Sequence, residues 1–323
     1  MMKKTKRVAM LFGMPRSGTT WVAKIIDSHP SVIYRHEPDS ERCIAVPLLN
    51  VDSFQHGDEI SRFYQDLEFI RTGKTCGKQP FFSKAYFNSL TAYLFKTSIY
   101  AAKLFGRLGI KSPIIEVIAE TAQPLTLLWK SIESVGRVGA IMATDPDSKM
   151  VFLVRHPCGQ IASVLSGENK NEFSSDVSSA DDYGVYEQLL TTDFAKSQHL
   201  DMEVLKSLTT VQRLAWRWLI YNEVALTELQ AYKDRTLIVF YDELCAEPIE
   251  LSKNIFEFLD LDWCRQTQDF LDQSVSVSQA SYYSVFKDPK KSSQSWKSKL
   301  PGEAVEAIKE IVMRGQYSRQ FFS

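Results

Sequence analysis

The stretch VAMLFGMPRSGTTWVAKII, residues 8–26, combines the three local patterns that decide the fold. Residues 8–12 form a short apolar run, which is typical of a strand buried on both faces of a parallel sheet. A glycine-containing loop follows, and from Thr19 onward apolar side chains recur at helical spacing until His29-Pro30 ends the helix. The chain therefore opens with a predicted strand, loop and helix, in that order.

The loop itself, GMPRSGTT at residues 13–20, has the frame G-x-x-x-x-G-x-T of a phosphate-binding loop. Its N–H groups at 17–20 would surround an anion at the start of the helix, where unpaired donors and the helix dipole favour negative charge. Nucleoside triphosphatases need a lysine after the second glycine to reach the outer phosphates, but Thr19 stands there and the cation is Arg16. The loop suits a single 5′-phosphate that carries a different transferable group.

A second unit of the same kind begins with the apolar run at residues 150–154. Arg155-His156-Pro157 follows this predicted strand, and apolar residues at helical spacing then predict a helix that ends near Gly167. Both loops would open at the carboxyl edge of one sheet, where α/β proteins bind ligands. We predict one domain over residues 1–323 with an α/β, P-loop-type three-layer fold, in which helices flank a central parallel sheet.

The remaining segments are predicted to pack around this sheet. Within residues 43–143, apolar residues of 125–135 recur at three- and four-residue steps, so we expect helices there. The aromatic residues of 86–100 either line an apolar pocket or belong to the core, and we favour the core. The other predicted elements are a polar surface loop at 168–182, a long or broken helix at 202–232, a strand at 237–240, helices at 248–259 and 303–314, and a polar, lysine-rich segment at 274–300.

Composition and charge limit the classes of function. The chain has 323 residues, of which 44% are hydrophobic, and its 38 Lys and Arg balance 39 Asp and Glu to a net charge of −1. Such a chain has no global basic field for nucleic acid, so any anion site must be local. The five cysteines are far apart and form no C-x-x-C pair, which favours a reducing compartment over a zinc or redox site. We expect no metal.

The N-terminus and the hydrophobic profile indicate a soluble protein. The basic start MMKKTKR is followed by an apolar stretch only over residues 8–14, which is too short for an export signal. No window approaches 18 uninterrupted apolar residues, so no transmembrane segment is expected. We therefore expect a cytoplasmic protein without a nucleic-acid partner, and the sequence leaves its oligomeric state open.

Two motifs together resemble one enzyme family. Residues 15–21, PRSGTTW, resemble the 5′-phosphosulfate-binding loop of sulfotransferases that use 3′-phosphoadenosine 5′-phosphosulfate (PAPS). Arg155 and Ser163, eight residues apart, are similar to the 3′-phosphate-binding pair of that family, and an arginine fork with a nearby hydroxyl suits a phosphate. The resemblance implies that PAPS is bound by Arg16, Ser17, Gly18, Thr19, Thr20, Trp21, Arg155 and Ser163. It also implies that part of 274–300 covers the cofactor, with Ser284 and Lys287 as the candidates.

The resemblance extends to the catalytic residues. Glu37, 21 residues after Arg16, resembles the base of the tyrosylprotein and carbohydrate branches, and Lys111 resembles the lysine of their Lys-x-Pro motif. His36 is the competing base, because the cytosolic small-molecule branch uses a histidine. The implied reaction is an in-line, metal-independent transfer of a sulfuryl group to an acceptor hydroxyl. Arg16 and Lys111 would neutralise the leaving phosphate, and the base would accept the acceptor's proton.

The sequence does not identify the acceptor, which is a sugar, a small alcohol or phenol, a lipid or a tyrosyl group. Residues 43–143 carry few family motifs, so we expect them to form the acceptor side. Two other functions remain as alternatives, a P-loop kinase of a small metabolite and a nucleotide-binding module without catalysis. The kinase predicts a lysine at position 19, and retention of Arg16, Glu37 and Lys111 argues against the binding module.

Overall fold

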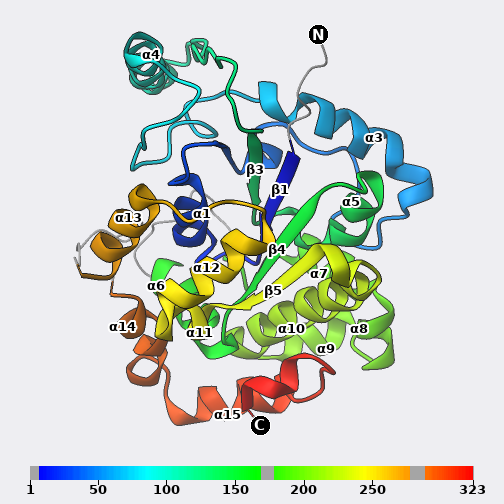
Figure 1. The fold of residues 1–323 in the computed structure, drawn as a ribbon. Coiled ribbons are helices and arrows are strands. Elements are labelled where there is room, and N and C mark those ends of the chain that lie inside the picture. The colour runs from blue at the N-terminus through cyan, green and yellow to red at the C-terminus, as the bar shows by residue number, and fades with distance from the viewer. Residues whose placement is uncertain (1–6, 169–177, 277–287, 323) are drawn as a thin grey trace.

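The computed structural model describes residues 7–168, 178–276 and 288–322, and it contains a five-stranded sheet in the order β2-β3-β1-β4-β5 (Figure 1). Every neighbouring pair of strands is parallel. The predicted α/β fold with a central parallel sheet is therefore confirmed. The strands are β1 (Arg7–Phe12), β2 (Val32–His36), β3 (Thr126–Ser131), β4 (Lys149–Val154) and β5 (Thr236–Phe240).

Helices cover both faces of the sheet, which gives three layers (Figure 1). Alternate residues of a strand point to opposite faces, and in β1 both sets are buried. Ala9 and Leu11 pack in one cluster with α1, α12 and α13, whereas Met10 and Phe12 pack in another with α3, α5, α6 and α10. The described helices are α1 (Thr19–Asp27), α2 (Pro38–Glu41), α3 (Ser53–Asp66), α4 (Ser89–Gly106), α5 (Val138–Thr144), α6 (Pro157–Glu168), α7 (Tyr183–Leu190), α8 (Asp193–Ser197), α9 (Met202–Ser207), α10 (Thr210–Leu229), α11 (Tyr241–Ala246), α12 (Pro248–Phe258), α13 (Arg265–Ser276), α14 (Pro289–Gln294) and α15 (Gly302–Val312).

One predicted helix is wrong, because residues 126–131 form β3 near the centre of the sheet. β3 pairs with both β1 and β2, and all six of its residues are buried. A strand buried on both faces is apolar at consecutive positions, so the same run also satisfies three- and four-residue steps. Because β3 is parallel to β1, it ends at the same edge of the sheet as the phosphate-binding loop, and the residues at its end lie near the candidate site.

The other predicted elements are confirmed or refined. Residues 202–232 are a broken helix, in which Thr209 begins α10 with a capping box that it forms with Gln212. The segment at 274–300 is helical where it is described, because α13 continues to Ser276 and α14 follows from Pro289. Residues 169–177 of the predicted surface loop, and 277–287 with Ser284 and Lys287, lie outside the described residues.

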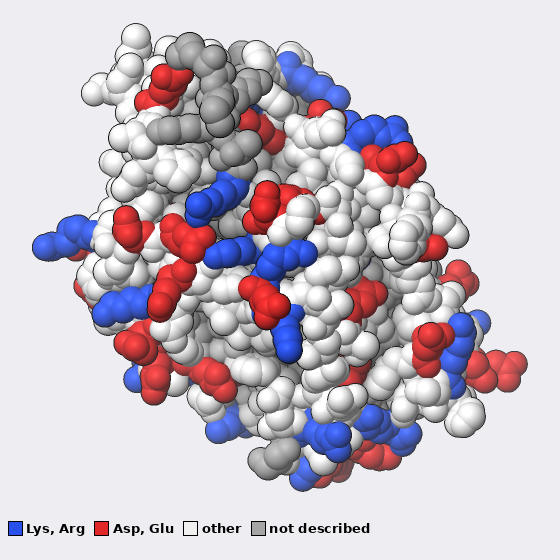
Figure 2. Space-filling model, turned by 45° about the vertical axis from the view of Figure 1, so that its right-hand side comes forward, with Lys and Arg blue, Asp and Glu red and all other residues white. Residues whose placement is uncertain are grey.

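Charged side chains of both signs are interleaved over the face of the molecule drawn in Figure 2. This mixture agrees with the near-zero net charge and with a local rather than global anion site. Within the described residues, no helix is both long enough and apolar enough to cross a bilayer.

Candidate active site

The loop between β1 and α1 is packed tightly against its neighbours. A Cβ atom at Gly13 would lie 2.5 Å from the carbonyl oxygen of Leu153 in β4. Gly18 has a φ of 91°, and a Cβ atom there would lie 2.2 Å from the ring of Tyr241 in α11. Only glycine satisfies both demands, so packing explains the two glycines of the sequence frame.

The start of α1 presents backbone donors to an anion. Gly18 is the N-cap and has no side chain that accepts hydrogen bonds from the first turn. The Ser17 N–H donates to the Met14 carbonyl oxygen over 3.1 Å, which closes a tight turn ahead of the helix. The side chains of Ser17 and Thr19 are buried, so it is the backbone of this turn that faces the helix start. This arrangement fits a phosphate group.

The second strand–loop–helix unit meets this loop directly. Arg155, which follows β4, donates from Nη1 to the Arg16 carbonyl oxygen over 2.8 Å. Gln160 in α6 donates to the Pro15 carbonyl oxygen over 2.9 Å. Arg16 Nε in turn donates to Ser163 Oγ over 3.1 Å. The structure thus brings together the three side chains that the sequence predicted for the two phosphates, Arg16, Arg155 and Ser163.

Arg155 is buried but incompletely paired. Its guanidinium lies 4.9 Å from the centre of the Tyr241 ring, and its Nη2 donates to the Ser292 carbonyl oxygen over 2.9 Å. Its Nε is buried and has no hydrogen-bond partner among the residues that the structure describes. Buried N–H groups are nearly always paired, so this donor is an exception among the described residues.

Trp21, which the sequence placed in the cofactor site, has a packing role in the structure. Its ring is buried, its Nε1 donates to Ser274 Oγ over 3.1 Å, and its edge meets the Tyr241 ring with the centroids 6.2 Å apart. These contacts join α1 to α13 and α11. The assignment of Trp21 to the cofactor site stays a prediction.

Glu37 lies at the carboxyl edge of the sheet, between the ends of β2 and β3. Its N–H donates to the Lys130 carbonyl oxygen over 2.8 Å, and the buried Lys130 Nζ donates to Glu37 Oε1. Lys74 Nζ lies 3.8 Å from Glu37 Oε2, and His36 Nε2 lies 3.7 Å from Glu37 Oε1. The carboxylate therefore has three basic side chains around it, and one of them is fully inside the protein.

The lysines hold Glu37 in its ionised form. Burial alone would raise the pKa of Glu37, but the charges of Lys130, Lys74 and Lys78 outweigh burial and lower that pKa. Burial lowers the pKa of Lys130, and the neighbouring carboxylate of Glu37 offsets part of that effect. Glu37 is consequently a carboxylate at neutral pH and is available to accept a proton.

His36 is neutral, and each of its ring nitrogens has a polar neighbour, Tyr34 at Nδ1 and Glu37 near Nε2. Burial, followed by the charges of Lys130 and Lys78, holds the pKa of His36 well below its ordinary value. Tyr34, whose pKa is raised by burial, keeps its proton, and its hydroxyl lies 2.7 Å from His36 Nδ1. If Tyr34 donates to Nδ1, the proton of the neutral ring is on Nε2, which faces Glu37. His36 Nε2 lies too far from Glu37 Oε1 for a hydrogen bond, so the choice between Glu37 and His36 as the base stays a prediction.

The structure does not bring Lys111 to this site. Lys111 is exposed, and no hydrogen bond or ion pair of it is found within the described residues. The lysine beside Glu37 is Lys130, the residue that follows the apolar run at 125–129. Interpreting that run as a strand would have placed Lys130 at a strand end, so the signal was present in the sequence.

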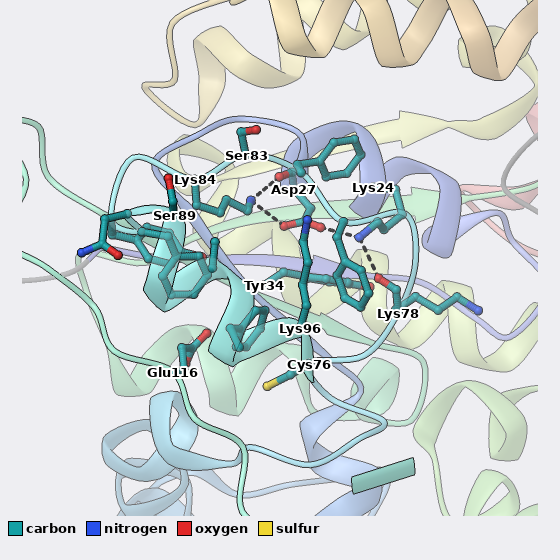
Figure 3. Close-up of a pocket in the computed structure, with 17 residues that line it drawn as sticks. Lys24, Asp27, Tyr34, Cys76, Lys78, Ser83, Lys84, Ser89, Lys96 and Glu116 are labelled. Atoms are coloured by element: carbon teal, nitrogen blue, oxygen red, sulfur yellow. Dashed lines mark hydrogen bonds and ion pairs between the residues drawn. The ribbon is translucent and has the colours of Figure 1, made fainter. Parts of the chain in front are cut away.

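A cavity of about 270 Å³ lies beside β2, between α1, α4 and the segment 76–89 that leads into α4 (Figure 3). In its wall, Lys24 and Lys84 both bind Asp27, the latter with Nζ 2.8 Å from Oδ1. Tyr34 and Lys78 also line the cavity, and each of them interacts with Glu37 or with a neighbour of Glu37. Tyr34 does so through His36, and Lys78 does so through its charge, which lowers the pKa of Glu37.

The aromatic residues of 86–100 divide between the two environments that the sequence left open, because Tyr86, Phe87 and Phe95 pack on the core clusters and also line this cavity. Phe87 and Phe95 form part of its wall, whereas Tyr93 and Tyr100 are exposed to solvent. Tyr86 belongs to both environments, since it is buried in the core cluster and also lines the cavity. The walls thus combine aromatic rings with lysines.

Comparison with known families identifies the family of the chain. Residues 9–265 match the sequence model described as "Sulfotransferase family", which is most of the chain. The protein therefore belongs to the sulfotransferase family and is a sulfotransferase enzyme. No curated protein matches the sequence.

Several solved sulfotransferase structures are similar over most of their length. The sulfotransferase domain from the curacin biosynthetic pathway is 14% identical with a TM-score of 0.47, and the match covers 97% of this chain and 98% of that one. Mouse sulfotransferase SULT7A1, in complex with PAP, is 12% identical with a TM-score of 0.47 over 98% and 88% of the two chains. Sulfotransferase STF9 from Mycobacterium avium is 14% identical with a TM-score of 0.43 over 95% and 75%.

Proposed function

We propose that this sulfotransferase takes its sulfuryl group from PAPS and transfers it to an acceptor hydroxyl. The observation that carries the proposal is the meeting of Arg16, Arg155 and Ser163 beside the start of α1, with a buried, unpartnered Nε on Arg155. These groups offer two adjacent anion positions. A donor with a 5′-phosphosulfate and a 3′-phosphate requires such a pair.

In this proposal each phosphate has its own donors. The N–H groups at the start of α1, with Arg16, hold the 5′-phosphosulfate. Arg155 and Ser163 hold the 3′-phosphate, for which Arg155 Nε supplies a donor that is unpaired among the described residues. The Arg155–Arg16 contact joins the two positions, so both are formed by one continuous set of residues.

The proposed transfer is an in-line displacement at sulfur, analogous to phosphoryl transfer. A bond forms from the acceptor oxygen to sulfur while the bond from sulfur to the bridging 5′-phosphate oxygen breaks. The acceptor's proton passes to a carboxylate oxygen of Glu37. Arg16 and Lys130 provide positive charge for the leaving phosphate and the sulfuryl oxygens, so Lys130 takes the role that the sequence gave to Lys111.

We further propose that the acceptor enters through the cavity beside β2. Its aromatic walls suit an apolar or ring-bearing acceptor, and its lysines suit an acceptor with a polar or anionic group. Tyr34 connects the cavity to His36 and Glu37, which supports delivery of the hydroxyl at this end.

The donor assignment is tested by thermal shift and by transfer of label from PAPS to a panel of hydroxyl acceptors. Adenosine 3′,5′-bisphosphate, the product of the donor, is expected to raise the melting temperature without magnesium, because both phosphates find donors in the chain. ATP with magnesium is expected to have little effect. Stabilisation by ATP with magnesium alone would overturn the proposal in favour of a kinase.

Arg155→Ala and Ser163→Ala are each expected to weaken binding of adenosine 3′,5′-bisphosphate about ten- to hundredfold. The reason is that one charge-assisted hydrogen bond contributes about 1.5–3 kcal/mol. Isothermal titration calorimetry measures the change, and Arg42→Ala, at an exposed arginine that pairs with Asp66, is the control. Wild-type affinity in either test variant would remove the 3′-phosphate assignment.

Gly18→Ala is expected to destabilise the protein and to abolish binding of adenosine 3′,5′-bisphosphate. A non-glycine residue at a φ of 91° costs about 1–2 kcal/mol, and the added methyl group would overlap the Tyr241 ring. Thermal unfolding and calorimetry measure the two effects. Gly57→Ala in α3 is the matched control, because a Cβ atom there meets no neighbour within 4 Å. Normal binding by Gly18→Ala would show that the nucleotide lies elsewhere.

A further inference from the structure

α4 presents an exposed apolar face in addition to the face that packs on the protein. Its inner side includes the buried Ser98 and Ile99. On the outer side, Leu90 and Tyr93 are each 65% exposed and Leu104 is 59% exposed. Figure 1 shows α4 at the upper left edge of the molecule, apart from the layers around the sheet, so its outer side faces away from the body.

The exposed apolar residues form a stripe along the helix. Successive residues turn by about 100°, so Leu90, Tyr93 and Leu104 fall within about 60° of one another. With a rise of 1.5 Å per residue, the stripe is roughly 21 Å long. Lys96 and Arg107 lie within about 20° of each other along one edge of it, and Lys96 also lines the cavity beside β2. The exposed side of α4 is therefore amphipathic, because basic residues lie along one edge of its hydrophobic stripe.

The stretch of chain that contains this stripe has charges of one sign. Between Lys84 and Glu116 the sequence has no Asp or Glu, but it has Lys96, Lys103, Arg107 and Lys111. The Lys103 ammonium donates to the Gly77 carbonyl oxygen, whereas the other three side chains are exposed. A second copy that docked through the same stripe would bring these cations together without any acid from α4 to neutralise them. Anionic lipid headgroups would neutralise them instead.

We propose that α4 docks the protein onto an anionic lipid surface, with the Leu90–Leu104 stripe at the boundary between headgroups and acyl chains. Helices with leucine and aromatic residues on one side and lysine or arginine beside them bind membranes in this way. α4 also forms one wall of the cavity beside β2 through Ala92 and Phe95. Docking therefore brings that cavity to within about one helix diameter, roughly 10 Å, of the headgroups.

Vesicle flotation tests the proposal and needs neither donor nor acceptor, so its outcome is separate from that of the proposed function. We expect the full chain to float with vesicles of phosphatidylcholine and phosphatidylserine mixed at about 70:30, and to remain at the bottom with phosphatidylcholine alone. Raising the salt from about 0.1 M to 1 M is expected to weaken binding, since it shortens the Debye length from about 10 Å to about 3 Å.

Two double variants separate the contributions of the stripe and of the charges. Leu90→Gln with Leu104→Gln is expected to lower vesicle partitioning at least tenfold. Lys96→Gln with Arg107→Gln is expected to lower it about thirtyfold on the anionic vesicles, because each cation near such a surface contributes about a fivefold factor. All four side chains are exposed, so both variants are expected to melt near the wild-type temperature.

Val204→Gln with Ile249→Gln is the matched control, since it removes two exposed apolar side chains from α9 and α12. Wild-type binding by this control supports the proposal. Three results would each overturn it: no flotation of the wild-type chain with anionic vesicles, an equal loss in the control, or a concentration-dependent dimer that Leu90→Gln with Leu104→Gln converts to monomer. The last result would identify the stripe as an interface between two copies of the chain.

Discussion

Glu37→Gln is expected to lower kcat about 10²–10⁴-fold for an alcohol acceptor and to leave the affinity for adenosine 3′,5′-bisphosphate unchanged. Glutamine keeps the shape of the side chain but accepts no proton at neutral pH. The residue lies at the ends of β2 and β3, away from the contacts that join Arg16, Arg155 and Ser163. Steady-state kinetics with labelled PAPS and calorimetry with the product nucleotide measure the two effects.

His36→Gln and a second acceptor provide the controls for this prediction. His36 is expected to matter less, because its nitrogens face Tyr34 and Glu37 rather than a substrate. An acidic phenol, which ionises more readily than an alcohol, depends less on a base, so the loss in Glu37→Gln should be smaller for it. A larger loss in His36→Gln than in Glu37→Gln would move the base to His36.

Lys130→Met is expected to reduce kcat strongly and to lower the free energy of unfolding by about 3–5 kcal/mol, because it leaves the Glu37 carboxylate in a partly dry site without its buried partner. Methionine has a similar length and keeps the packing of β3. Lys74→Met is the matched control, since the Lys74 side chain is 44% exposed and its Nζ is 3.8 Å from Glu37. It should cost at most about 1 kcal/mol. Equal losses in the two variants would contradict the special role of Lys130.

The pH profile gives a second readout of the same pair. In the wild type the pKa of Glu37 lies below its ordinary value of 4.5, so the ion pair stabilises the fold above that pH and is lost as the pH falls through the lower, folded value. In Lys130→Met the largest positive charge near Glu37 is gone. Burial, which raises the pKa of Glu37, is then less strongly opposed, so that pKa rises. The acid limb of the activity profile should therefore move to higher pH in Lys130→Met and move less in Lys74→Met, because the charge of Lys74 contributes less to lowering the pKa of Glu37.

The parts of the fold that sequence could predict are those in which a single pattern has a single explanation. The run at residues 8–12 is too short for a buried helix and ends at a glycine loop, so only a buried strand agrees with it. Arg155 and Ser163 could be paired from sequence because both belong to one strand–loop–helix unit, in which their distance along the chain limits their distance in space. In the structure both contact Arg16, and their role as phosphate ligands stays a prediction.

The edge of the sheet beside Glu37 was harder to predict for two physical reasons. β2 contains the buried Arg35, which interrupts the apolar pattern and is tolerated because Glu116, from a distant segment, pairs with its guanidinium. β3 is apolar at every position from 127 to 129, so its period is hidden. Without these two strands, the sequence does not indicate Lys130 as the neighbour of Glu37.

The ring of Tyr241 has a consequence for selectivity. It lies against Gly18 on one side and under the Arg155 guanidinium on the other, and it is itself buried in α11. A rigid ring in that place sets the separation of the two proposed phosphate positions before any nucleotide arrives. A ligand with both phosphates then binds as a chelate, since its second contact forms at the high effective concentration created by the first. A nucleotide with one phosphate lacks the second contact and binds more weakly. In the proposed function, the preference for a nucleotide with two phosphates therefore depends on the spacing of the two charges rather than on the base.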